Sequence, residues 1–208
     1  MIVSEILDIT VDSEIANLSV GEKYKKGTSE EKLEAGYQLI SYLNLGLIEL
    51  SKRFTLRTEA VLLNLYPEVN IYTVRNPELI RVIDAYDATG KQLRFPDTVG
   101  DTSFDIKEVA YDTFLIPVVK ESQVMLVAKY IVKQVEALAD EIDIPLVMID
   151  ALCNYIAYKA YSSLGGNNKK DSDVYFARFE QNCMILASMG YNDTSEILGK
   201  NISHRGFV

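Results

Sequence analysis

The sequence has few of the residues that most often build catalytic and metal sites. Its 208 residues include one histidine, two cysteines and no tryptophan. Metal sites and nucleophilic active sites usually need clusters of His and Cys. Any triad would have to use His204, in a terminal tail that holds a base poorly in register. We therefore expect no catalytic residue, no metal and no cofactor, and a protein that is not an enzyme.

Long apolar runs are also missing. No run approaches the roughly 18 residues that a membrane-crossing helix needs, and no basic-then-apolar signal segment opens the printed sequence. We expect a soluble protein, made in the cytoplasm, that does not bind membranes. Cys153 and Cys183 each lie on the apolar face of a predicted helix, and we expect reduced core thiols there rather than a disulfide.

Positive charge is in deficit, with 21 Lys and Arg against 30 Asp and Glu and a net charge of −9. A surface that grips duplex DNA needs clustered basic residues, so the composition argues against one. It remains compatible with a wall past which DNA slides. The run Asp140-Glu141-Asp143 could supply an acid–base pair, but the pattern favours charges that complement a helix N-terminus.

The clearest pattern that is present is a helix hairpin over residues 143–189. Pro145 suits a first helical position, Gly165 and Gly166 suit the elbow, and Gly190 suits the end of the second helix. Both predicted helices have apolar residues at helical spacing. These are Leu146, Ile149, Leu152, Cys153, Ile156, Ala157, Ala160 and Leu164, then Val174, Phe176, Phe179, Cys183, Leu186 and Ala187.

A second long helix is predicted from Ser29 to Phe54, where Thr28 and Glu31 match a capping box. Its predicted apolar face is Leu33, Tyr37, Ile40, Leu43, Leu47, Leu50 and Phe54. Gly36 and Gly46 inside it indicate either close contact with a neighbouring helix or plain tolerance. Residues 1–20 form either a short helix or an arm on a neighbour, and residues 21–27 read as a charged turn.

Between residues 56 and 130 the apolar period changes to two. Short alternating runs separated by turns predict antiparallel strands in a small sheet or open barrel, with a hairpin loop at 87–90 and a long exposed loop at 95–103. The fold class is therefore α+β. Residues 1–55 and 131–190 form a helical core, residues 56–130 an inserted β subdomain, and residues 191–208 a C-terminal tail.

Tyrosine is the dominant aromatic residue, with 13 copies. Its apolar ring and polar tip suit subunit contacts. The candidates for a subunit interface are Tyr37, Tyr155, Tyr158, Tyr161 and Tyr175. The alternative is that these rings edge the core of a single chain.

The order of elements resembles one family in particular. The segments that carry the resemblance are Leu43-Asn44 on a capped helix ending at 50–54, then 71–74, 79–83, the D-x-x-G turn at 87–90, 111–117, 124–130, E-I-D-I-P at 141–145, and 157–161. Over residues 29–190 the chain resembles the head-to-tail adaptor (connector) proteins of tailed bacteriophages, above all short-tailed ones, and is similar to ring proteins of crAss-like phages. The resemblance implies a virion structural protein without catalysis. Such adaptors form a ring, usually of twelve copies, beneath the portal. The ring extends the DNA channel without sequence-specific binding and presents a platform for other tail proteins.

The tail from Tyr191 to Val208 is polar and buries too little apolar area to fold alone. The resemblance implies that it docks on the portal protein, through Ile197, Leu198, Ile202, His204, Arg205 and Phe207. Two other functions stay open. One is a neck or tail-completion protein lower in the same assembly, and the other is a small cytoplasmic α+β enzyme or ligand-binding domain.

Overall fold

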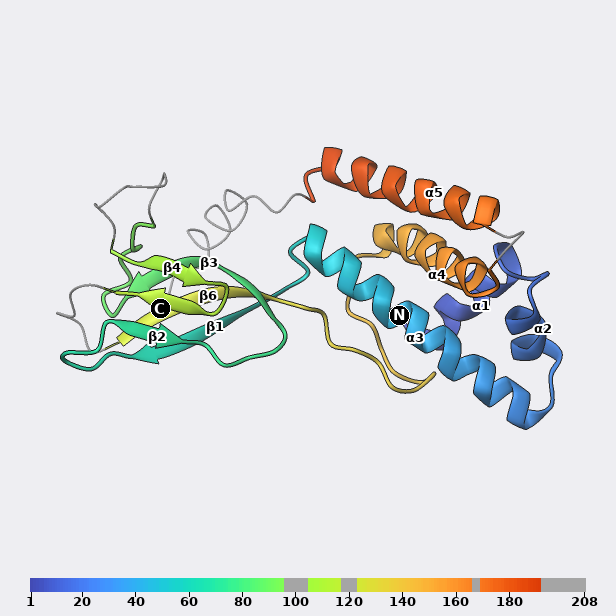
Figure 1. Ribbon diagram of the computed structural model, residues 1–208, viewed down its shortest axis with the longest axis horizontal. Coiled ribbons are helices and arrows are strands. Elements are labelled where there is room, and N and C mark those ends of the chain that lie inside the picture. The colour runs from blue at the N-terminus through green and yellow to red at the C-terminus, as the bar shows by residue number, and fades with distance from the viewer. Residues whose placement is uncertain (96–104, 117–122, 166–168, 192–208) are drawn as a thin grey trace. The chain divides into compact units, whose positions relative to one another are not determined.

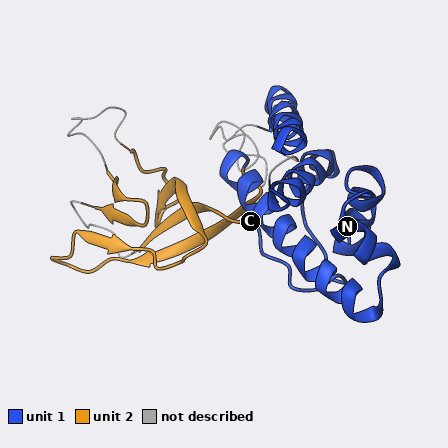
Figure 2. Ribbon diagram, turned by 45° about the vertical axis from the view of Figure 1, so that its right-hand side comes forward, with its two compact units in different colours: residues 1–54, 132–192 blue, residues 55–131, 193–208 orange. Residues whose placement is uncertain are grey.

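A computed structural model describes residues 1–95, 105–116, 123–165 and 169–191 (Figure 1). The α+β prediction is confirmed: within these residues the chain forms five α-helices and two three-stranded antiparallel sheets, which do not close into a barrel. The chain divides into two compact units (Figure 2). Met1–Phe54 and Val132–Asn192 form the helical unit, and Thr55–Ile131 belong to the β unit.

The helical unit begins with α1 (Val3–Ser13) and α2 (Ser19–Lys26). Of the two alternatives for residues 1–20, the structure has the short helix: α1, whose apolar face is buried against α4 of the same chain. The predicted turn at 21–27 is wrong, because α2 covers most of it. Lysines in the last turn of α2 complement the negative helix end, and Lys25 bonds Asp8 and Asp12 of α1 at 3.0 and 3.1 Å.

Helix α3 (Ser29–Arg53) begins at the predicted capping box. The Glu31 N–H donates to Thr28 Oγ1 at 3.3 Å, and the Thr28 N–H donates to Glu31 Oε2 at 2.9 Å. The predicted apolar face is correct from residue 40 onward but wrong at Leu33 and Tyr37, which are 56% and 58% exposed. In this part of the helix the buried face consists of Ala35, Gly36 and Leu39. Two of these residues are small, and a pattern that counts only large apolar side chains overlooks them.

The predicted hairpin is present as the 3₁₀ turn η1 (Leu146–Met148), α4 (Ile149–Ser163) and α5 (Lys169–Ser188). Helix α5 folds back along α4, and α4 lies between α3 and α5 (Figure 1). Pro145 precedes η1, and Gly165 and Gly190 have φ of 64° and 91°, the left-handed region that glycine adopts freely. Gly166 lies outside the described residues. Four residues assigned to the hairpin core are instead exposed: Leu146, Leu164, Val174 and Phe176.

The β unit contains two sheets. The first has the order β1-β6-β3, from β1 (Arg57–Asn64), β6 (Gln123–Tyr130) and β3 (Leu79–Asp87). The second has the order β2-β5-β4, from β2 (Ile71–Thr73), β5 (Thr113–Leu115) and β4 (Lys107–Ala110). Residues from both sheets share one apolar core, so the insertion has its own hydrophobic centre.

The turn after β3 is formed by residue types that favour tight turns. Asp87 Oδ1 accepts the N–H groups of Thr89 and Lys91, both at 2.9 Å, and Gly90 has φ of 84°. The hairpin loop predicted at 87–90 is therefore confirmed. The loop expected at 95–103 lies, after Phe95, outside the described residues.

The return segment after β6 is anchored despite its polarity. Val132, Val135 and Ile142 are buried. The Asn44 side chain bonds the N–H of Val135 at 2.9 Å and its carbonyl at 2.8 Å. Asp140 accepts two backbone N–H groups at 2.8 and 2.9 Å, which lower its pKa. Asp140 therefore closes a turn ahead of η1 and does not cap a helix.

Candidate functional site

The tyrosines of the hairpin pack in or beside the core of their own chain. Tyr155 of α4 is 5% exposed, and its ring centroid lies 5.0 Å from Phe179 and 5.6 Å from Tyr158. Burial raises the pKa of Tyr155 to about 12. Tyr155 is thus a core residue, and its assignment to a subunit interface is wrong because its ring has no surface to offer a second copy.

Three other tyrosine candidates lie at the edge of the chain's own core, which is the alternative that the sequence left open. Tyr161 and Tyr175 stack at 5.1 Å, and both hydroxyls donate to the Glu14 carbonyl, at 3.3 and 3.1 Å. These two hydrogen bonds connect the C-terminal end of α1 to the hairpin. Tyr158 is half-buried against Phe176 at 5.0 Å. Tyr37 stands apart from them, largely exposed on α3.

One ion pair connects α3 to α5. Arg53 donates two hydrogen bonds to the Glu180 carboxylate, at 2.6 and 2.8 Å, and its guanidinium lies 4.9 Å from the centre of the Phe179 ring. Bidentate geometry of this kind is among the stronger polar contacts. The bonds from Arg53 hold the pKa of Glu180 below its ordinary value.

Both cysteines are free and buried, which confirms the prediction of reduced core thiols. Burial raises the pKa of Cys183 to about 11 and also raises that of Cys153. Since the thiolate is the reactive form, neither cysteine is set up as a nucleophile.

One side of α5 is exposed and partly apolar. Val174, Arg178, Gln181, Ile185 and Met189 follow one another at intervals of three or four residues, so they share one face of the helix. Val174, Ile185 and Met189 are 44%, 44% and 63% exposed. The adjoining turn η1, which contacts α5, exposes two further large apolar side chains, Leu146 and Val147. We call these five apolar residues the α5 patch: Leu146, Val147, Val174, Ile185 and Met189.

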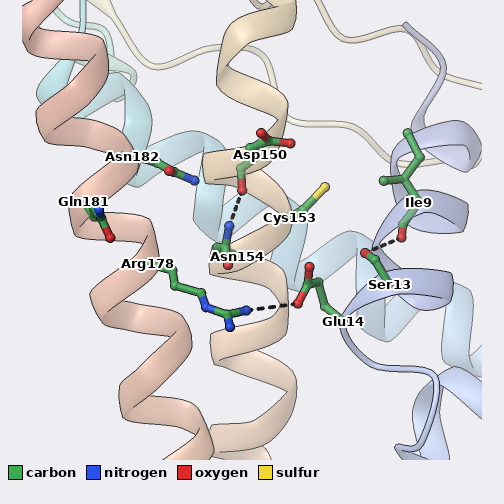
Figure 3. A pocket seen from close by; sticks show the side chains of 9 residues that line it. All are labelled: Ile9, Ser13, Glu14, Asp150, Cys153, Asn154, Arg178, Gln181 and Asn182. Carbon is green, nitrogen blue, oxygen red and sulfur yellow. Dashed lines mark hydrogen bonds and ion pairs between the residues drawn. The ribbon is translucent and has the colours of Figure 1, made fainter.

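The same face of α5 borders a polar groove of about 280 Å³ (Figure 3). Helix α1 and its C-cap contribute Ile9, Ser13 and Glu14 to the lining, α4 contributes Asp150, Cys153 and Asn154, and α5 contributes Arg178, Gln181 and Asn182. The sequence analysis nominated none of the polar ones. No sequence motif could have revealed them, because they come from three separate segments of the chain: residues 9–14, 150–154 and 178–182.

Two polar contacts define the groove. Arg178 Nη1 lies 3.6 Å from Glu14 Oε2, and Asn154 Nδ2 donates to the Asp150 carbonyl at 2.7 Å. The other amide atom, Asn154 Oδ1, is buried and has no hydrogen-bond donor within the part of the chain that the structure describes. An acceptor of this kind is uncommon in folded proteins.

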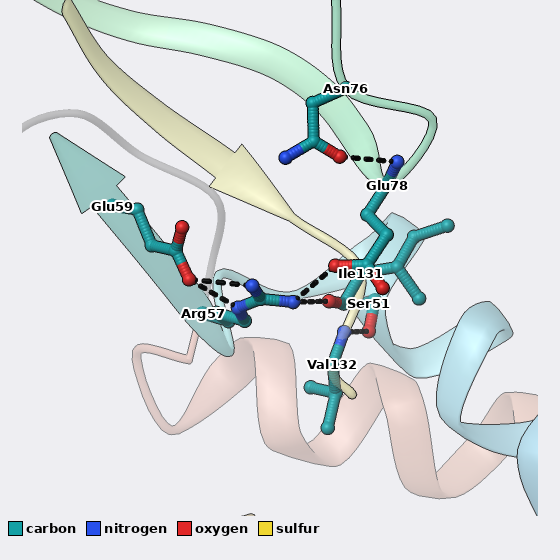
Figure 4. A network of polar contacts seen from close by, with 7 residues as sticks. All are labelled: Ser51, Arg57, Glu59, Asn76, Glu78, Ile131 and Val132. Atoms are coloured by element: carbon teal, nitrogen blue, oxygen red, sulfur yellow. Dashed lines mark hydrogen bonds and ion pairs between the residues drawn. The ribbon is translucent and has the colours of Figure 1, made fainter. Parts of the chain in front are cut away.

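Arg57 organises the residues where the β unit begins and ends (Figure 4). Its guanidinium donates to Glu59 at 2.6 and 2.8 Å, to Glu78 at 2.6 Å and to the Ile131 carbonyl at 3.0 Å. One side chain thus fixes the first strand to the last residue of the same unit. In the helical unit the Val132 N–H donates to Ser51 Oγ at 3.1 Å. Both groups of contacts have a structural role, each within its own unit.

The residues expected to dock on a portal lie outside the described residues: Ile197, Leu198, Ile202, His204, Arg205 and Phe207. Within the described ranges, no three His, Cys, Asp or Glu side chains are grouped so that they could hold a metal ion. No helix in those ranges has the length and apolarity to cross a bilayer.

Comparison with known proteins adds no assignment: the sequence matches no protein-family model and no curated protein sequence.

Proposed function

We propose that the chain is a head-to-tail adaptor of a tailed bacteriophage, which assembles into a ring of about twelve copies beneath the portal and extends the DNA channel. The order of elements that resembles this family supports the proposal, as does a helical unit with an inserted β unit. The observation that carries it is the α5 patch. Large apolar side chains exposed at both η1 and the C-terminal end of α5 are typical of an interaction surface rather than of a free monomer face.

The complementary surface for the α5 patch lies on α3. Helix α4 separates α3 from α5, and α3 exposes Leu33, Tyr37 and Leu45, which are 43–58% exposed. A contact between the α5 patch of one copy and these α3 residues of the next joins two different surfaces. Repeated head-to-tail contacts of this kind form a ring where the rotation between neighbouring copies closes, and a ring is the assembly that an adaptor requires.

The remaining parts of the proposal concern the ring's partners. The net charge of −9 suits a channel wall that DNA passes without binding. The tail from residue 191 onward would dock on the portal, and the platform would receive further tail proteins. The chain would then be found in the neck or tail of the phage particle.

The test of assembly uses light scattering on the purified chain, alone and mixed with the portal protein of the same phage. We expect a ring-sized complex with portal. The double variant Ile185→Gln, Met189→Gln should weaken ring formation at least tenfold, because two apolar contacts are lost for each subunit. The control Leu62→Gln, which changes a side chain 63% exposed on β1, should assemble as the parent does.

Two outcomes would count against the proposal. If the double variant assembles as well as the parent, the α5 patch is not the ring contact. If the parent chain does not bind the portal protein and is absent from the neck in cryo-electron microscopy of the particle, the proposed adaptor function is wrong. A ring found lower in the tail would replace it with a neck or tail-completion protein.

A further inference from the structure

We infer that the open edge of β1 binds an extended segment of another protein, which adds to the sheet as a further strand. The segment has an uncharged middle, with apolar residues at alternate positions, between two basic ends. This inference does not depend on ring formation. It comes from the contrast between β1 and the other sheet edges, from the turn that follows β1, and from the charges at the two ends of this edge.

Within the described residues, three of the four sheet edges carry features that hinder strand addition. Strand β2 has only three residues, and β4 has a bulge between Glu108 and Ala110. Strand β3 is irregular in register, and the segment that follows it covers its edge, where the Leu93 N–H donates to the Ala85 carbonyl at 2.8 Å. These three edges are therefore poor templates for another strand.

Strand β1, the fourth edge, is long, regular and uncharged along most of its length. Its eight residues pair with β6 in an unbroken antiparallel register, and residues 60–64 contain no charge and no proline. In the part of the chain that the structure describes, no backbone hydrogen bond outside the β1–β6 pairing reaches residues 58–64. Alternate N–H and C=O groups of an edge strand point away from its neighbour, and an added strand would bond them.

Side chains on both faces of β1 are incompletely covered. Val61 and Leu63 pack against the core of the β unit but are only partly buried, whereas Leu62 between them is 63% exposed. An added strand with apolar residues at alternate positions would cover these side chains, because residues of neighbouring strands lie side by side on each face. In such complexes the backbone bonds give affinity and the side chains give specificity.

The turn after β1 is strained and extends the apolar surface. Glu68 has φ of 70°, in the left-handed region that residues other than glycine rarely adopt. The Tyr72 hydroxyl fixes the turn, because it accepts the Tyr66 N–H and donates to the Val69 carbonyl, both at 2.9 Å. Tyr66 and Val69 are 60% and 40% exposed just beyond the end of β1. Backbone strain of this kind is concentrated at functional sites.

The charges at the two ends of the edge define the partner. Arg57 is shared between the carboxylates of Glu59 and Glu78 (Figure 4), so this end of β1 is negative, and Glu68 adds a negative charge beyond the other end. An extended segment with a basic residue at each end complements both.

A second copy of β1 fits this edge less well. It would bring the same negative groups. An edge-to-edge contact of eight residues is about 27 Å long and about 5 Å wide, which is far less than the ~800 Å² per partner that a stable dimer buries. The occupant is therefore an extended segment of a different protein.

The test is a titration of the full chain with the peptide acetyl-KTVTVTVTK-amide, followed by ¹⁵N NMR and amide hydrogen exchange. We expect saturable shifts in β1 and slower exchange of alternate amides within residues 58–64. The matched peptide acetyl-ETVTVTVTE-amide should bind at least tenfold more weakly, and the difference should shrink at high salt. No binding of the lysine peptide at about 1 mM, or protection at the edge of β2, β3 or β4 instead, would overturn the inference.

Two N-methylated versions of the lysine peptide test whether backbone hydrogen bonds hold it. An N-methyl group on every second residue removes the N–H groups along one edge of an extended peptide, and methylation of the remaining residues removes those along the opposite edge. One version should lose binding and the other should keep it. If both versions bind as the unmethylated peptide does, no strand is added and the inference is wrong.

Variants separate this edge from the ring contact. Leu62→Gln should weaken binding of the lysine peptide severalfold, because an apolar contact is lost, and should leave ring assembly unchanged. The double variant Ile185→Gln, Met189→Gln should bind the peptide as the parent does. If the parent self-associates and the peptide abolishes that association, a second copy occupies the edge, against the inference. A chain that forms no ring but binds the peptide along β1 would reject the adaptor assembly and support strand addition.

Discussion

Two glycines in α3 have different roles at the scale of single residues. A methyl group on Gly46 would lie 2.6 Å from Leu152 Cδ1 and 3.2 Å from Tyr155 Cδ1. Both neighbours are buried, so they have little room to move. A methyl group on Gly36 would meet Leu138 at 3.6 Å, which is ordinary contact. Gly46 therefore lets α3 approach α4 closely, whereas Gly36 is a tolerated residue.

The substitutions Gly46→Ala and Gly36→Ala should accordingly change stability in opposite directions. Overpacking costs about 1–3 kcal/mol, which exceeds the gain of about 0.5–1 kcal/mol from replacing a helical glycine. We expect Gly46→Ala to lower the free energy of unfolding by about 1 kcal/mol and Gly36→Ala to raise it by about 0.5–1 kcal/mol. Urea denaturation measures both, and a stabilised Gly46→Ala would show that α3 and α4 are not tightly packed there.

At the scale of elements, α5 depends on few contacts besides α4. The Arg53–Glu180 pair is the bidentate link from α3, and both side chains are about a third exposed, at 32% and 31%. Solvent at that exposure weakens the Coulomb attraction. The pair should therefore orient α5 more than it stabilises the fold, and its contribution should depend on pH.

Replacing Glu180 with Gln should lower the free energy of unfolding by about 1 kcal/mol at pH 7. The pKa of Glu180 is lowered in the folded state, so its contribution is fully present above the unfolded value of about 4.3 and is lost as the pH falls through the lower folded value. The difference between parent and variant should then vanish. Thermal melts between pH 7 and pH 2.5 measure it.

The control for this prediction is Asp173→Asn, which removes an exposed carboxylate from the same helix. It should change stability by less than about 0.5 kcal/mol at any of these pH values. A difference between parent and Glu180→Gln that grows on acidification would contradict the assigned sign.

At the scale of the whole molecule, the chain consists of two units with separate cores. The β unit has its own buried cluster, with Leu126 and Phe114 fully inaccessible. The helical unit is formed by segments from both ends of the described chain. Units with separate cores open with separate free energies, so a core substitution in one should loosen that unit alone.

Leu126→Ala should cost about 2–5 kcal/mol within the β unit. We expect amide hydrogen exchange to accelerate in β1, β3 and β6 while α3 and α4 keep their protection. Leu43→Ala, at a buried position of α3, should give the reverse pattern. If either variant lowers protection uniformly in both units, the chain opens as one cooperative body.

Periodicity and capping residues were sufficient to predict most elements. The predicted hairpin, the cap of α3 at Thr28 and Glu31, and the loop at Asp87–Gly90 are all present. Each depends on residues near one another in the chain, which is why local rules find them. Two of the failures, α2 and the first turns of α3, are places where small residues such as Gly21 and Gly36 form the buried face.

The α+β class, the helices of the hairpin and the buried thiols follow from the amino-acid sequence alone, because helical and strand periodicity is a local property of the chain. Which apolar residues remain exposed depends instead on the tertiary packing. It buried Tyr155, exposed Ile185 and Met189, and brought Glu14, Asn154 and Arg178 around one groove. The physical reason is that exposure and site geometry depend on how distant segments pack, and the spacing of residues along one segment does not encode that packing.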